Sequence, residues 1–362
     1  MMKESVPDRQ GVALVALFIV GNAIIYGMAW RAGRDVWLSF LLAMGLCFPL
    51  ILLYARMHSL MHGQTFSEGM QNLFGKWPSR IITLLYSLYA WRLGSYVVKD
   101  LTNFIQAVSL EETPQVVTAI AFAILIVWAV KAGIEVLARW SSLMVLVVST
   151  VLVLTLLLAI AQVKLEEFLP VMYDGFGPVL LGAFQIMDFP LLETVLLVVA
   201  LGALTKQNSS YKVFLSGFFL AALFLMMIAS FSLAVIGTEK YTTSYYPIFL
   251  ATARVDVAQF LTRLELGAGV MFVVGGVLKT AVCLLAACKG LAHSLGFPDY
   301  RFLVTPVVLS IIPGSQWLVK SSIEIEKNAT KVFAISDVLF QIVLPVLLWI
   351  VAEIRITRRP QH

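Results

Sequence analysis

The sequence has few charged residues. Only 13% of its 362 residues are Asp, Glu, Lys or Arg, whereas soluble domains usually contain roughly 25%. So few charges cannot cover a solvated surface, and 60% of the residues are hydrophobic, with a mean hydropathy of +0.90. These values exclude an ordinary soluble protein and predict an integral membrane protein.

Motifs for metal, nucleotide and redox chemistry are also missing. The three cysteines, Cys47, Cys283 and Cys288, lie in apolar stretches without C-x-x-C spacing, which predicts buried thiols rather than a metal or redox centre. The sequence contains no P-loop, no G-x-G-x-x-G and no H-E-x-x-H. We therefore expect that the protein is not an enzyme and that it binds no cofactor. The small net charge of +5 favours contact with anionic membrane lipid over nucleic acid.

Long apolar windows are the dominant feature that is present. A helix crosses a ~30 Å hydrocarbon core in about 20 residues, and lipid forces each crossing segment to satisfy its own backbone hydrogen bonds. Runs such as 143–160 lack the alternation of barrel strands, so the fold class is all-α. About ten spans are predicted, at 11–30, 36–57, 79–108, 115–130, 141–163, 176–202, 211–236, 263–290, 302–320 and 333–353. The length of the first window predicts an uncleaved span rather than a signal peptide.

These spans form two sets of five within a single integral membrane domain, 1–362. The first repeat covers 11–163 and the second covers 176–353. An odd number of spans per half makes the second half enter from the opposite side, as an inverted-repeat, transporter-like fold requires. Lysine and arginine are more numerous in the loops on the N-terminal side, which predicts that both termini are cytoplasmic. The longer breaks at 58–78 and 237–262 are each expected to hold a short interfacial helix.

Two spans carry interruptions at corresponding positions. Polar and helix-breaking residues occur half-way along the first span and half-way along the sixth, where Pro190 removes a backbone donor. Broken helices in matching positions of two repeats predict a ligand site at the membrane midplane, because their ends leave backbone dipoles free. The candidate ligand-binding residues there are Gly21, Asn22, Asp188, Phe189 and Glu193. The alternative is that Gly21 and Gly27 only allow close helix packing and that Pro190 is a tolerated kink.

Buried charge supplies the other candidates. A charged group at bilayer depth costs at least about 2.5–3.5 kcal/mol on insertion scales, so each needs a partner or a task. Arg92, Tyr96 and Lys99 share one face of the third span, and we expect Arg92 and Tyr96 to line a cavity. Lys99 either lines it too or extends to the membrane surface. Lys279 lies near the centre of the eighth span, where Glu193 or the opened first helix could bind its ammonium. Its role is either to occupy the place of a coupling cation or to form a structural ion pair.

Several strings resemble the spore germination protein family, the B subunit of nutrient germinant receptors within the amino acid–polyamine–organocation transporter superfamily. They are 31–43 (RAGRDVWLSFLLA), 112–117 (ETPQVV), 132–139 (AGIEVLAR), 168–184 (FLPVMYDGFGPVLLGAF) and the position of Lys279. Glu193 and Lys279 fall at polar positions that the family pattern also carries. The resemblance implies helices 1 and 6 unwound around an amino-acid-like ligand, and a place in the spore inner membrane. It also implies an A subunit and a C lipoprotein as partners.

The expected function is therefore a receptor subunit that binds a small nutrient, such as an amino acid, and triggers germination. A proton-coupled amino acid secondary transporter is the alternative, with Asp188 or Glu193 as the proton carrier. A scaffold for the A subunit with a vestigial pocket is the third possibility. The sequence does not separate the receptor from the transporter, because the site would look the same in both, whereas the scaffold would bind no ligand.

Overall fold

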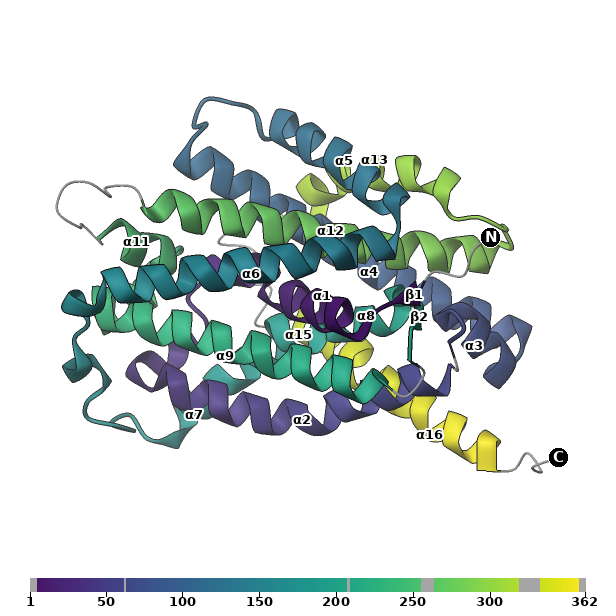
Figure 1. The fold of residues 1–362 in the computed structure, drawn as a ribbon, viewed down its shortest axis with the longest axis horizontal. Coiled ribbons are helices and arrows are strands. Elements are labelled where there is room, and N and C mark those ends of the chain that lie inside the picture. Colours follow the sequence, from purple (N-terminus) through teal and green to yellow (C-terminus); the bar gives the residue numbers. More distant parts are fainter. Residues whose placement is uncertain (1–4, 62, 207–208, 255–263, 319–332, 358–362) are drawn as a thin grey trace.

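The computed structural model describes residues 5–61, 63–206, 209–254, 264–318 and 333–357, and nearly all of them are helical (Figure 1). The α-helices are α1 (Asp8–Val20), α2 (Val36–Leu60), α3 (Phe66–Phe74), α4 (Lys76–Val108), α5 (Gln115–Ala132), α6 (Ile134–Leu158), α7 (Phe176–Ile186), α8 (Val195–Ala200), α9 (Ser210–Ile236), α10 (Thr238–Thr243), α11 (Pro247–Ala253), α12 (Leu264–Leu295), α13 (Arg301–Leu318), α15 (Phe333–Val338) and α16 (Leu344–Thr357). Tighter or wider turns join them at η1 (Gly21–Ile25), η2 (Trp30–Asp35), η3 (Ile160–Gln162), η4 (Leu165–Phe168), η5 (Met187–Leu191), η6 (Leu192–Thr194) and η8 (Leu339–Val343).

The predicted spans appear in order along the chain. Nine stretches of the described residues are long and apolar enough to cross a membrane. The remaining predicted span, 302–320, corresponds to α13, whose apolar run is interrupted by Pro306 and Pro313. Residues 319 and 320 of that span lie outside the described residues, as does residue 263 at the start of the eighth. The polytopic helical fold is therefore confirmed.

The start of the fifth span was predicted seven residues too late, at 141. In the structure α6 begins at Ile134, directly after Gly133, whose φ of 87° ends the preceding helix. The charged residues Glu135 and Arg139 resemble a loop in the sequence, but they lie one helical turn apart and form an ion pair of 3.6 Å on α6. An ion pair between residues four apart stabilises a helix, so charged residues can lie in its first turns.

The two longer breaks contain the expected short helices. In the first, α3 begins with a capping box between Thr65 and Glu68. Its apolar stripe, including Phe66 and Met70, is buried and packs against α4 of the same chain. In the second break the described helices are α10 and α11, and residues 255–262 lie outside the described part of the chain.

The burial pattern separates central helices from peripheral ones. Helix α1 is buried along most of its length and packs against α6, α9 and α12, near the centre of the bundle in Figure 1. The outer helices α5 and α6 instead expose large apolar side chains, such as Trp128 and Leu146, which are 70% and 63% exposed. An apolar outer surface of this size is stable only against lipid.

One end of the bundle is closed by a short strand pair. Ser5–Val6 (β1) pairs in parallel with Ala203–Leu204 (β2), so the segment before α1 is hydrogen-bonded to the segment after α8. The end of α16 lies at the same end of the bundle in Figure 1. The start and the end of the described chain therefore face the same side.

Candidate functional site

The first span is interrupted at Gly21. Helix α1 stops at Val20, the chain continues as the 3-10 turn η1, and Tyr26 is extended. Gly21 has a φ of 27°, and a Cβ built on it would lie 2.8 Å from Cδ of Lys279. A Cβ on Gly275 of α12 would lie 2.7 Å from the Gly21 carbonyl oxygen. The interruption therefore depends on two facing glycines that allow α12 to approach the opened backbone.

The sixth span is interrupted at Phe189. Helix α7 ends at Ile186, and the π-helical turn η5 contains Phe189 in an extended conformation (φ −134°, ψ 121°) followed by Pro190. The 3-10 turn η6 then leads into α8. The predicted interruptions near Asn22 and Asp188 are thus both present, and the first of them also includes the close helix packing that was the alternative for Gly21.

A cavity of about 530 Å³ lies between the two interruptions. Its walls come from the η1 region, α4, the sixth span, the segment from α10 to α11, and the last span. Five of the predicted site residues line it: Asn22, Tyr96, Asp188, Phe189 and Glu193. The other three predicted residues, Gly21, Arg92 and Lys279, do not line it and lie behind its walls.

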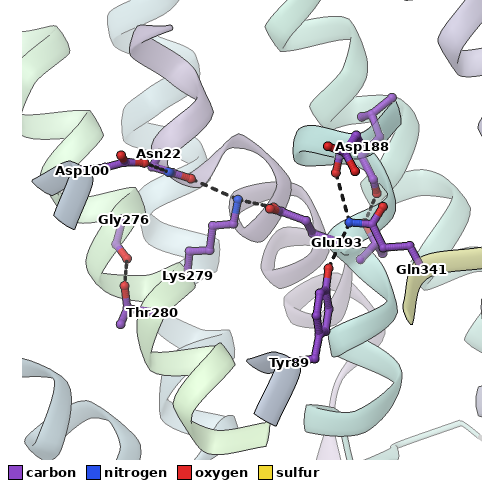
Figure 2. A network of polar contacts seen from close by, with 11 residues as sticks. Asn22, Tyr89, Asp100, Asp188, Glu193, Gly276, Lys279, Thr280 and Gln341 are labelled. Atoms are coloured by element: carbon purple, nitrogen blue, oxygen red, sulfur yellow. Dashed lines mark hydrogen bonds and ion pairs between the residues drawn. The ribbon is translucent and has the colours of Figure 1, made fainter. Parts of the chain in front are cut away.

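Lys279 joins the two interrupted helices behind the cavity (Figure 2). Its side chain is fully buried, its ammonium forms an ion pair with Glu193, and it donates a 3.0 Å hydrogen bond to Oδ1 of Asn22. Nδ2 of Asn22 in turn donates to Oδ2 of Asp100, at 2.7 Å. The Lys279 ammonium also lies 4.6 Å from the centre of the Phe189 ring, a cation–π contact. One buried cation therefore holds the first and the sixth spans together.

Arg92 is neutralised by a residue that the sequence analysis did not single out. Its guanidinium forms an ion pair with Asp337 of α15 and lies near the rings of Tyr89 and Tyr96. The prediction that Arg92 and Tyr96 line the cavity is thus correct for Tyr96. It is wrong for Arg92, which lies behind the wall. Lys99 does not line the cavity either, because it donates to the side-chain oxygens of Gln115 and Gln316 at 2.8 and 2.9 Å.

The cavity wall is acidic and aromatic. Four carboxyl side chains line it, those of Asp100, Asp188, Glu193 and Asp337. Two of the four form ion pairs with cations behind the wall, and among the described lining residues Arg31 is the only lysine or arginine. The rings of Tyr26, Phe189 and Tyr245 cover one side, with Tyr26 centred 6.2 Å from Phe189 and 5.7 Å from Tyr245.

Two buried carboxylate or amide oxygens in this wall, Oδ1 of Asp188 and Oε1 of Gln185, have neither a hydrogen-bond nor an ion-pair partner among the described residues. Oε2 of Glu193 also accepts no hydrogen bond, but it forms the ion pair with Lys279. A buried acceptor without a donor costs about 1–3 kcal/mol, and more when it is charged. A ligand with N–H groups would satisfy both acceptors, so this part of the wall is suited to an ammonium or amide.

Several lining residues were not predicted from the sequence. Tyr26, Asp337 and the polar segment 242–245 line the cavity, and Gln341 contacts it through Asp188. Gln341 had a usable signal, because it is a single amide in the apolar run of the last span. For the segment 242–245 the sequence gives no signal that would distinguish it from an ordinary loop.

Comparison with known proteins identifies the family. A family profile described as "Spore germination protein" matches residues 5–318. The chain belongs to the spore germination protein family. A relative in the family is Spore germination protein KB of Bacillus subtilis (strain 168), which is 24% identical over 363 residues, covering 99% of this chain and 97% of that protein.

Two solved structures share the fold of this spore germination protein. One is MHP1, a nucleobase-cation-symport-1 family transporter in a closed conformation with bromovinylhydantoin bound. Its TM-score is 0.69 at 14% identity, with 93% of this chain and 75% of that chain covered. The other is MhsT in complex with L-phenylalanine, with a TM-score of 0.60 at 15% identity, and 98% and 90% of the two chains covered. The predicted transporter-like fold with interrupted helices 1 and 6 is confirmed.

Proposed function

We propose that this spore germination protein is the membrane subunit of a nutrient germinant receptor. It binds a small nutrient with an ammonium group, such as an amino acid, and binding triggers germination. The observation that supports this proposal most directly is the unpaired Oδ1 of Asp188 in a cavity between two interrupted helices. Burial of a carboxylate oxygen without a donor is costly unless a ligand supplies one.

The charges of the cavity favour the amine end of such a nutrient. Asp188, Phe189 and Glu193 all line the cavity, so a ligand ammonium in it would find carboxylates and an aromatic ring in the same wall. The Gln185 amide lines the same wall and could accept from a second N–H group. Arg31 in η2 is the cation available to a ligand carboxylate. A zwitterion would thus find a partner for its ammonium in Asp188 and a partner for its carboxylate in Arg31. A sugar would supply no cation to the Asp188 carboxylate.

The assembly and location of the receptor are part of the same proposal. We infer that the chain functions in the spore inner membrane with both termini cytoplasmic, together with an A subunit and a C lipoprotein. The positions of β1 and the end of α16 on one side of the bundle support a common side for the termini. The membership of the spore germination family supports the spore membrane.

A binding experiment tests the proposal. The purified protein in detergent is screened by thermal stability against the twenty L-amino acids, D-glucose and inosine, and each compound that stabilises it is titrated. We expect stabilisation by one or more amino acids, and about a 10–100-fold weaker affinity in D188N, because a hydrogen bond to a charged group contributes about 1.5–3 kcal/mol.

The matched control is D174N, a carboxylate replaced in the exposed segment before α7. Spores carrying D188N should also need a correspondingly higher amino acid concentration to germinate. The proposal is wrong if no amino acid stabilises the wild type, or if D188N and D174N bind equally well.

A proton-coupled amino acid transporter is the second candidate, supported by the fold shared with the transporter MHP1 and with MhsT, whose structure holds L-phenylalanine. Protein reconstituted in liposomes distinguishes the two functions. Accumulation of a labelled amino acid driven by a proton gradient indicates transport, whereas binding without accumulation indicates a receptor.

A further inference from the structure

A single amide side chain is buried in the last span. Gln341 is 2% exposed and lies in η8, a π-helical turn between α15 and α16. The wider turn presents the Gln341 carbonyl oxygen to the Tyr54 hydroxyl of α2, which donates to it. Turns of this kind occur mostly as single insertions in α-helices and often mark functional positions.

The Gln341 amide contacts the interruption of the sixth span directly. Its Nε2 donates to the backbone carbonyl oxygen of Asp188 at 3.1 Å and to the Tyr89 hydroxyl at 3.0 Å (Figure 2). Both N–H groups of the amide are thereby used, one on the broken helix and one on α4. The ring of Tyr89 is itself fixed, because it stacks on Phe340 with centroids 4.8 Å apart.

These contacts act on the backbone of the residue whose carboxylate faces the cavity. The extended conformation of Phe189 takes the sixth span out of its helical ladder at this point. A buried carbonyl freed from a helix must find another donor, and Gln341 supplies it. With the Asp188 backbone held on this side, its Oδ1 is left toward the cavity without a protein donor.

We propose that Gln341 is a positioning residue that fixes the broken sixth helix so that the Asp188 carboxylate is presented to the ligand. This inference rests on the proposed function, since it assigns Gln341 a role at the same ligand site. Gln341 does not line the cavity, and its contact with a lining residue is the hydrogen bond to the Asp188 backbone. A contact from the last span thus holds the site in its binding conformation before the ligand arrives. Such pre-organisation increases affinity because less ordering is needed on binding.

The test compares Q341M, which keeps a side chain of similar length but has no N–H donor, with two controls. Y89F removes only the second partner of the amide and leaves the bond to Asp188. S310A removes a part-buried side-chain hydrogen bond, from Trp91 to Ser310, outside the cavity wall. If Q341M does not fold, Q341N replaces it, with an amide one methylene shorter.

The first measurement is amide hydrogen exchange, which needs no ligand. We expect faster exchange over residues 187–194 in Q341M than in the wild type, Y89F or S310A. Unchanged exchange in Q341M overturns the proposal. This arm decides the question even if the wild type binds none of the amino acids, in which case only the proposed function fails.

The second measurement is a double-mutant cycle on affinity for the twenty L-amino acids used as probes above. We expect Q341M to weaken binding by about tenfold, the effect of losing about 1.4 kcal/mol. In a D188N background the same change should have no further effect, because Gln341 acts through Asp188. Equal losses in both backgrounds would show a general packing role and would overturn the proposal.

Discussion

Replacing Lys279 by methionine removes one charge from the centre of the protein and leaves an unbranched side chain that is one atom shorter. The side chain of Lys279 is 0% exposed and that of Glu193 is 4% exposed, so neither charged group is solvated. The variant leaves Glu193 without its ion-pair partner and Asn22 Oδ1 without its donor. Breaking a buried pair by removing one partner typically costs about 3–5 kcal/mol, and we expect K279M to lose stability in that range.

The double variant K279M/E193Q separates the loss of the pair from the loss of a charge. It removes both charges, so Glu193 no longer leaves an unpaired carboxylate in the interior. Replacing a buried ion pair by uncharged groups of similar volume often changes the stability of the protein little. We therefore expect the double variant to be more stable than K279M by about 0.5–3 kcal/mol, the range of coupling energies for contacting residues.

Unfolding is followed by tryptophan fluorescence as a function of SDS in mixed micelles. The control K131M replaces an exposed lysine at the end of α5, and its midpoint should equal that of the wild type. The reasoning is refuted if K279M is as stable as K131M, or if the double variant is no more stable than K279M. Either result would mean that the Lys279 ammonium does not hold the two interrupted helices together.

Two further predictions concern the contacts around α1. G275A should lower stability and expression strongly, because its Cβ would lie 2.7 Å from the Gly21 carbonyl oxygen, whereas G45A, with no atom within 4 Å, should be neutral or slightly stabilising in thermal unfolding. In a background without the native cysteines, S5C and T205C should cross-link under mild oxidation, because the two hydroxyl oxygens lie 3.2 Å apart. A cross-link that forms only in denatured protein would contradict the closed strand pair.

The architecture of the chain could be predicted from hydropathy because the membrane imposes length and composition on each span. The positions of the two interruptions followed from Gly21 and Pro190, whose backbone properties act locally. The boundary of α6 was missed for the opposite reason. Glu135 and Arg139 are charged residues whose helical pairing becomes visible only once their geometry is known.

The site was less predictable, because the partners of buried charges come from distant parts of the chain. Arg92 lies at a favourable position on the third span, yet its partner Asp337 follows 245 residues later. The amides that bind Lys99 likewise come from α5 and α13. A helical face shows that a charge is buried, but only the packing of the spans decides which charge faces the ligand.

In the structure, some buried charges pair with one another in or behind the cavity wall, and another faces the ligand site. Lys279 and Arg92 both lie behind the cavity wall, and each pairs with a carboxylate that lines it. Such pairs lower the cost of burying the carboxylates of Glu193 and Asp337 at membrane depth. Asp188 forms no ion pair of its own among the described residues, although Arg92 is close enough to act on its charge, and its Oδ1 has no donor. A ligand ammonium would complete this arrangement. The affinity of D188N therefore tests the proposed function more directly than the affinity of any variant at an ion-paired residue.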